Sequence, residues 1–154
     1  MKQALIITDV QEDFLGNSDY IVPLCQKYLN TFAEAYDLVI LTHWKHQENK
    51  NTNTLMLSHP HAKIIEKTTY SAINEEVRGL LENHEIHRVH LAGMDAEATI
   101  MATMFHLLDL GYEVQILERL LASYFTRGWE ATTIMRHILG DENVLSIGGD
   151  RVWL

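Results

Sequence analysis

The alternation of short apolar runs with longer segments of helical periodicity constrains the fold most strongly. Each run has six to eight residues, is rich in Val, Ile and Leu, and is nearly continuous, which is typical of strands covered on both faces. Strands that alternate with helices favour a doubly wound α/β fold, here a three-layer α/β/α sandwich around a six-stranded, mainly parallel, Rossmann-like sheet. The predicted strands are ALIITDV (4–10), DLVILTHW (37–44), AKIIEK (62–67), RVHLAG (88–93), YEVQILE (112–118) and NVLSIG (143–148).

Helical segments separate these strands and share one domain with them. Gly111 and Gly140 stand just past the last two segments, where a left-handed C-cap favours glycine. A chain of 154 residues can bury a full hydrophobic core, so we predict a single domain over residues 1–154. The polar stretch 45–61 has no clear period and is interpreted as a loop between the second and third strands. A loop of this length is either functional or simply mobile. The predicted helices are residues 21–35, 72–84, 97–110 and 128–139.

The composition argues against several classes of partner. A formal net charge of −9 without a long basic run argues against nucleic acid. No apolar run approaches the roughly 20 residues of a membrane-spanning helix, and the apolar part of MKQALIITDV is too short for a signal peptide. The single cysteine, Cys25, rules out an intrachain disulfide and fits a reducing compartment. We therefore expect a soluble, cytoplasmic protein.

Polar residues stand at the carboxyl ends of the predicted strands, where open parallel sheets bind ligands. Each has an ordinary alternative interpretation as a helix cap or a solvent-facing residue. Asp9 and Lys67 are the most informative pair, because a carboxylate and an ammonium at neighbouring strand ends keep each other charged and can move a proton. The candidates are Asp9, Thr42, His43, Lys67, residues 93–99 and Glu118.

Four stretches carry a family resemblance. ALIITDVQEDF resembles an opening strand with an Asp-x-Gln-x-Asp-Phe motif, and EKTTYSAI resembles a Lys-x-x-Tyr-Ser-Ala-Phe motif. VHLAGMDAEATIMATMFHLLDLGYEVQIL resembles a Gly-x-x-Thr-x-x-Cys-Val turn, its helix and a Gly-x-x-Val strand. ASYFTRGWEATTIMRHI resembles a last helix and its lead-in. In this order, over nearly the whole chain, they resemble the isochorismatase-like hydrolase superfamily, which includes nicotinamidases, carbamoylases and isochorismatases.

The resemblance implies an isochorismatase-like α/β/α fold, hydrolysis of a small molecule, and a homodimer or higher homo-oligomer. It places the catalytic aspartate at Asp9, the family lysine at Lys67, and the position of the nucleophilic cysteine at Thr99. It further implies substrate-binding residues at Phe14, His43, Tyr70, Met94 and Asp95.

Thr99 leaves three interpretations open, because Cys25 lies in the first helical segment and cannot replace the missing thiol. In the first, Thr99 is itself the nucleophile, which requires a strong adjacent base. In the second, our leading hypothesis, Asp9 protonates a vinyl ether and water attacks the resulting cation, while Lys67 orients Asp9 and the substrate carboxylates. Isochorismatases without the cysteine resemble this case. In the third, the chain is catalytically silent and binds a small molecule or a partner.

The bend before Thr99 contains two further acids, Asp95 and Glu97. The resemblance implies an oxyanion hole from the backbone N–H groups of Asp95 and Thr99, beside a cis peptide bond between Met94 and Asp95. Two carboxylates oppose the negative charge that such donors stabilise, so ordinary amide hydrolysis is disfavoured. The alternative interpretation is that both acids cap the following helix, whose N-terminal dipole favours them.

The histidines give a weaker metal signal. Nicotinamidase-like members bind a metal through an Asp-x-His pair and a later histidine, and the matching stretch THWKHQEN supplies His43 and His46 without the aspartate. His59 and His61 are further candidates from the long loop, since imidazoles beside carboxylates hold zinc or iron. We expect no cofactor, with a divalent metal at His43 and His46 as the minor alternative.

Overall fold

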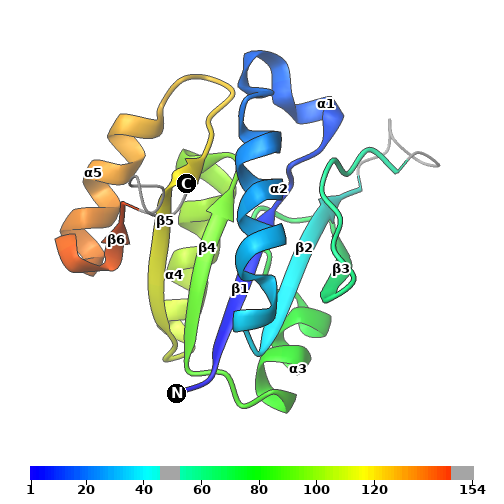
Figure 1. The fold of residues 1–154 in the computed structure, drawn as a ribbon. Helices are drawn as coiled ribbons and strands as arrows, with labels where there is room; N and C mark the ends of the chain where they lie inside the picture. The colour runs from blue at the N-terminus through cyan, green and yellow to red at the C-terminus, as the bar shows by residue number, and fades with distance from the viewer. Residues whose placement is uncertain (46–52, 147–154) are drawn as a thin grey trace.

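The computed structural model describes residues 1–45 and 53–146 (Figure 1). Its strands are β1 (Gln3–Thr8), β2 (Leu38–Trp44), β3 (Ala62–Lys67), β4 (Arg88–Gly93), β5 (Glu113–Leu121) and β6 (Val144–Leu145). Its helices are α1 (Glu12–Leu15), α2 (Ile21–Phe32), α3 (Glu75–Asn83), α4 (Met101–Asp109) and α5 (Gly128–Leu139). The short helical turns are η1 (Gly16–Ser18), η2 (Ala33–Ala35), η4 (Ala96–Ile100) and η5 (Asp141–Asn143).

The six strands form one parallel sheet in the order β3-β2-β1-β4-β5-β6. The chain adds β2 and β3 on one side of β1 and then returns to add β4, β5 and β6 on the other. The direction of winding therefore reverses between β1 and β4, which is where open α/β sheets bind their ligands. Thr8, the last residue of β1, is paired with Thr42 on one side and with Gly93 on the other.

Helices cover both faces of this sheet and bury two hydrophobic clusters. On one face α2 packs against β4 and β5, and it buries Cys25 and Leu29 in a cluster that includes Leu5. On the other face α3, α4 and α5 cover Ile6 and Leu91, also buried completely. Figure 1 shows α2 in front of the sheet and α4 behind it. Because strand residues of both orientations are buried, the runs read as continuous hydrophobic sequence.

The fold confirms the predicted α/β class, with differences at the ends of elements. The segment predicted as one helix over residues 97–110 is divided into the π-helical turn η4 and the α-helix α4. Strand β5 extends three residues further than predicted, to Leu121, and its pairing with β4 shifts register between Leu91 and Gly93. Helix α1 has only four residues, too few for a periodic signal in the sequence.

The loop predicted for residues 45–61 is described only in part, from residue 53 onward. Thr54 O accepts the N–H of Glu12 at 2.8 Å, and Met56 N donates to Val10 O at 2.9 Å, so this part of the loop lies beside the segment after β1. Leu57 is buried in the cluster under α2. No helix among residues 1–45 and 53–146 is long and apolar enough to cross a membrane.

Candidate functional site

The site is built around Asp9, which follows β1 at the reversal point of the sheet. Its backbone is left-handed, with φ 52°, a region that costs a non-glycine residue free energy. The Asp9 N–H donates to the carbonyl and the hydroxyl oxygens of Thr42, each at 3.2 Å. The Gln11 N–H donates to the Asp9 carbonyl at 2.9 Å. These bonds hold the turn, and the Asp9 side chain is buried with 1% of the residue exposed.

Glycine at position 93 allows β4 to approach β1 closely beside Asp9. Gly93 has φ +114°, and a Cβ there would lie 2.2 Å from the carbonyl oxygen of Thr8. The Thr8 hydroxyl donates to the Met94 carbonyl at 3.1 Å, which fastens the chain just after β4. Residues after β4 therefore lie against the end of β1.

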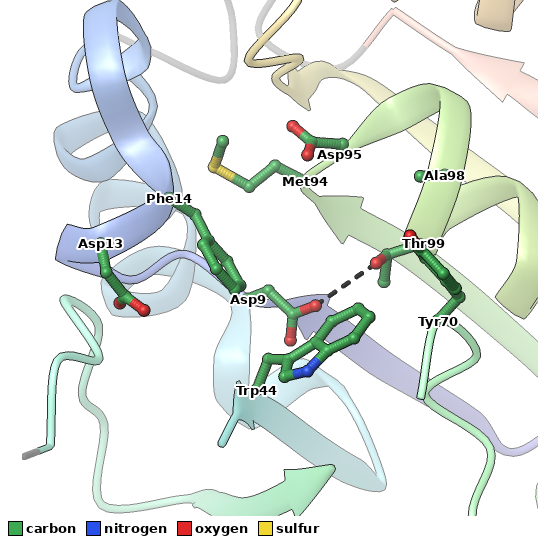
Figure 2. Close-up of a pocket in the computed structure, with 9 residues that line it drawn as sticks. All are labelled: Asp9, Asp13, Phe14, Trp44, Tyr70, Met94, Asp95, Ala98 and Thr99. Atoms are coloured by element: carbon green, nitrogen blue, oxygen red, sulfur yellow. Dashed lines mark hydrogen bonds between the residues drawn. The ribbon is translucent and has the colours of Figure 1, made fainter. Parts of the chain in front are cut away.

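Three donors converge on the Asp9 carboxylate from three different parts of the chain. The Thr42 hydroxyl at the end of β2 donates to Oδ1 at 2.7 Å. Lys67 Nζ at the end of β3 lies 2.9 Å from Oδ2. The Thr99 hydroxyl in η4 donates to Oδ2 at 3.4 Å (Figure 2). The sheet topology alone brings these groups together, because they are 33, 58 and 90 residues from Asp9 in the sequence.

Lys67 is enclosed as completely as its partner, with none of its side chain exposed. Besides Asp9, its Nζ donates to the carbonyl oxygens of Thr69 at 2.5 Å and Tyr70 at 3.3 Å. An ammonium has three N–H donors, so these three acceptors use all of them. The Trp44 ring lies over the ammonium, with its centroid 3.8 Å from Nζ, a cation–π contact.

Burial sets the protonation behaviour of this pair. It raises the pKa of the Asp9 carboxyl, while the Lys67 ammonium and, after it, the hydroxyls of Thr42 and Thr99 act in the opposite direction. Burial also lowers the pKa of Lys67, against the attraction of Asp9. Desolvation disfavours both charged forms, so Asp9 holds a proton more readily than an exposed aspartate does.

A cavity of about 520 Å³ opens above Asp9. Figure 2 shows Phe14, Trp44 and Tyr70 around Asp9, with Met94 and Asp95 at the opposite wall. Six of the residues expected in the site line this cavity: Asp9, Phe14, Tyr70, Met94, Asp95 and Thr99. Lys67 lies behind Asp9 rather than in the wall. His43 is not a lining residue, and its Nε2 lies 3.1 Å from the Thr54 hydroxyl.

Sequence reasoning missed two residues that line the cavity, Asp13 and Trp44. Trp44 ends β2 one residue after His43, so its strand-end position was a usable signal. Asp13 belongs to the quoted QEDF stretch, and its Oδ1 accepts from the Thr54 hydroxyl at 2.5 Å and from Gln11 Nε2 at 3.0 Å. Ala98 also lines the cavity and lies within the candidate range 93–99.

The two acids of the bend bind the segment after β5 and do not cap the helix. Asp95 is the N-cap residue of η4, but its side chain makes no capping bond. Its Oδ1 accepts instead from the N–H of Tyr124 at 2.8 Å, and Glu97 Oε2 accepts from the Ser123 hydroxyl at 3.0 Å. The capping interpretation is therefore wrong, because a tertiary contact supplies the donors. The peptide bond between Met94 and Asp95 is cis, as expected.

The described residues do not assemble into a metal centre. Within residues 1–45 and 53–146 no group of three or more His, Cys, Asp or Glu side chains is placed to hold an ion. His61 stands before the first residue of β3, at the opposite end of that strand from Lys67, and its N–H donates to His59 Nδ1 at 3.0 Å. His46 lies outside the described residues.

Comparisons with known proteins agree with the geometry. Residues 3–138 match the isochorismatase domain family. Isochorismatase domain-containing protein 2 of Xenopus laevis is 27% identical over 117 residues, which are 73% of this chain and 57% of that protein. The chain thus spans little more than half the length of this curated relative.

Solved structures share the fold at low sequence identity. The zinc complex of a pyrazinamidase from Pyrococcus horikoshii is 23% identical, with a TM-score of 0.79 over 90% of this chain and 97% of that one. A nicotinamidase from Bacillus subtilis is also 23% identical, with a TM-score of 0.74 over 91% and 97% of the two chains. An isochorismatase-like hydrolase from Alkaliphilus metalliredigens is 20% identical, with a TM-score of 0.78 over 90% and 92%. Because the family match covers residues 3–138, well over half of the sequence, the chain belongs to the isochorismatase family.

Proposed function

We propose that this protein is a small-molecule hydrolase in which Asp9 acts as a general acid on an acid-labile bond of the vinyl-ether type. The observation that carries the proposal is a buried carboxyl with a raised pKa at the floor of an open cavity of about 520 Å³. A general acid works best when its pKa lies near the working pH, and burial moves that of an aspartate in this direction.

In the proposed reaction, Asp9 gives its proton to the substrate carbon of the C=C–O unit, which leaves an oxygen-stabilised cation. Water adds to this cation, the C–O bond of the resulting adduct breaks, and the proton released by the water returns to Asp9. The Asp9 carboxylate formed in the first step accepts from Lys67, Thr42 and Thr99, which lie within 3.4 Å. These fixed donors stabilise the conjugate base without reorganisation.

The charge of the cavity favours this reaction over amide hydrolysis. The proposed intermediate is positive, and Asp95 in the wall places a carboxylate beside it. Amide hydrolysis forms an oxyanion, which the same carboxylate repels. Lys67 uses its three N–H donors on Asp9 and two carbonyl oxygens. We therefore propose that Lys67 positions Asp9 and does not bind the substrate.

The Thr99 hydroxyl donates to Asp9, and this bond favours a second candidate, in which Thr99 attacks an acyl substrate with Asp9 as its base. A threonine hydroxyl is almost un-ionised near neutral pH and requires a strong base. The two candidates differ in what position 99 must supply. Acid catalysis requires only a donor to Asp9, whereas acyl transfer requires the attacking oxygen itself.

A panel of vinyl ethers and simple esters, incubated with the purified chain and analysed by mass spectrometry, tests the proposal. Asp9→Asn should abolish vinyl-ether cleavage and leave the fold intact, and Asp19→Asn, an exposed aspartate after η1, should cleave as the wild type does. Thr99→Val should keep part of the activity if Asp9 is the acid. Cleavage that persists in Asp9→Asn overturns acid catalysis, and ester cleavage that vanishes in Thr99→Val favours the nucleophile. Ligand binding without any turnover supports a silent binding protein.

A further inference from the structure

A second cavity adjoins the first on its outer side. It measures about 260 Å³ and is lined by Asp13, Phe14, Asp95, Tyr124 and Phe125. Three of these residues, Asp13, Phe14 and Asp95, also line the cavity above Asp9. A molecule seated over Asp9 can therefore extend outward between Phe14 and Asp95 into this outer cavity.

Two rings of the outer cavity are presented to solvent. Phe125 is 70% exposed and Tyr124 is 53% exposed. Neither ring belongs to the hydrophobic clusters that flank the sheet. They pack edge to face, with centroids 5.0 Å apart. Because both rings are exposed and line the cavity, they are available to contact a ligand. Their faces carry the negative potential of the aromatic quadrupole, which attracts cations.

The rings are held in place beside a carboxylate. The Tyr124 N–H donates to Asp95 Oδ1, and a Cβ at Gly16 would lie 2.6 Å from the Tyr124 ring, so glycine lets the ring pack closely. Within the described part of the chain, the other oxygen of Asp95, Oδ2, has no hydrogen-bond partner. Asp95 is half-buried, and burial followed by repulsion from Glu97 raises its pKa. A cation bound at Oδ2 would offset both the cost of burying the Asp95 charge and its repulsion from Glu97.

Neither cavity has a basic side chain among its described lining residues. Lys67 is not available to a ligand, because its three acceptors and the Trp44 ring enclose it. A substrate carboxylate would thus meet Asp95 and two aromatic rings, while an ammonium or guanidinium group would be attracted by all three. The net charge of −9 adds a long-range attraction for cations.

We propose that the outer cavity binds a cationic group of the substrate, an organic ammonium or guanidinium, through Asp95, Tyr124 and Phe125. This inference rests on the proposed function, since it treats the two cavities as one substrate site with the reacting bond over Asp9. It selects an organic cation as the substrate class and disfavours dicarboxylates.

Calorimetric titration of the full chain with three probes tests the inference. The probes are benzyltrimethylammonium, uncharged benzyl alcohol and anionic phenylacetate. The cation should bind more tightly than either of the others. Asp95→Asn keeps an acceptor for Tyr124 but removes the charge, and Phe125→Leu removes a ring. Each should weaken binding of the cation about two- to fivefold. The matched controls Asp19→Asn and Phe105→Leu, exposed residues outside the cavity, should leave the affinity unchanged.

Equal affinity for the three probes, or an unchanged affinity in Asp95→Asn and Phe125→Leu, would overturn the cationic subsite. Because probe binding is measured without turnover, its failure is distinct from failure of the reaction. Loss of vinyl-ether cleavage in Asp9→Asn without any preference for the cation would refute the subsite alone. A preference for the cation with full cleavage in Asp9→Asn would support the subsite and refute acid catalysis by Asp9.

Discussion

Replacing Lys67 by methionine should change how the stability of the protein depends on pH. In the wild type, Asp9 and Lys67 are both buried and lie 2.9 Å apart. We expect the folded pair to hold one proton in total, on Asp9 or on Lys67, because either arrangement leaves the buried pair without net charge. The unfolded pair also holds one proton between the ordinary pKa values of 3.8 and 10.5. The pair therefore contributes no slope to the free energy of unfolding in this range.

The Lys67→Met variant removes this balance. Breaking one side of a buried ion pair costs about 3–5 kcal/mol, within the about 5–15 kcal/mol by which domains of this kind are stable. Loss of the ammonium removes the main influence that lowers the pKa of Asp9, so the folded carboxyl keeps its proton while the unfolded one ionises above 3.8. Stability should then fall as pH rises, by about 1.4 kcal/mol per pH unit.

Asp9→Asn should show the opposite slope. Burial lowers the pKa of a solitary Lys67 below 10.5, so the unfolded state binds a proton that the folded state binds less well. Stability should fall as pH decreases, and the double variant Asp9→Asn/Lys67→Met should show neither slope. Urea unfolding followed by circular dichroism between about pH 5 and 8 measures all three. A Lys67→Met protein with the pH dependence of the wild type would refute the reasoning, since Asp9 would then ionise without its partner.

Two further substitutions test residues of β4, the strand that lies beside β1 and Asp9. Gly93→Ala should destabilise the fold by more than about 3 kcal/mol, because its Cβ would lie 2.2 Å from Thr8 O and its φ is positive. A urea unfolding midpoint equal to that of the wild type would contradict this. His90, bonded to Tyr36 and Gln115, has a pKa lowered by burial, so stability should decrease as pH falls below its ordinary value of 6.5. His90→Gln should lose that component when melting temperatures are compared across this range, and identical curves would argue against it.

Local sequence patterns were sufficient for the six strands and the α/β class, but they did not give the order of the strands in the sheet. Six apolar runs became the six strands, and Gly111 and Gly140 follow the last two helices with positive φ as expected. The meeting of Asp9 and Lys67 followed from their strand ends, because parallel strands bring those ends to one edge. The two strands are not neighbours as expected, since β2 lies between β1 and β3. These features depend on residues close in sequence and on the general rules of α/β topology.

Features that depend on tertiary contacts were not predictable. The donors to Asp95 and Glu97 come from Ser123 and Tyr124, more than 25 residues away, so the expectation of helix capping failed. The enclosure of Lys67 by two carbonyl oxygens has no side-chain signature in the sequence. Backbone acceptors and π turns are set by how the chain packs, and residue types alone do not specify them.

The π turn at η4 makes the composition of the cavity wall sensitive to chain length. Its defining bond runs from the N–H of Ile100 to the carbonyl of Asp95, five residues back, so the turn contains one residue more than an α-helix would. Each residue of an α-helix adds about 100° of rotation. With α4 fixed by its packing on the sheet, deleting Ala98 would keep Thr99 near Asp9 and rotate Asp95 out of the wall. Glu97 would then take the place of Ala98 in the wall, so a single-residue deletion is a route by which a relative of this chain can change which acid of the bend faces the cavity.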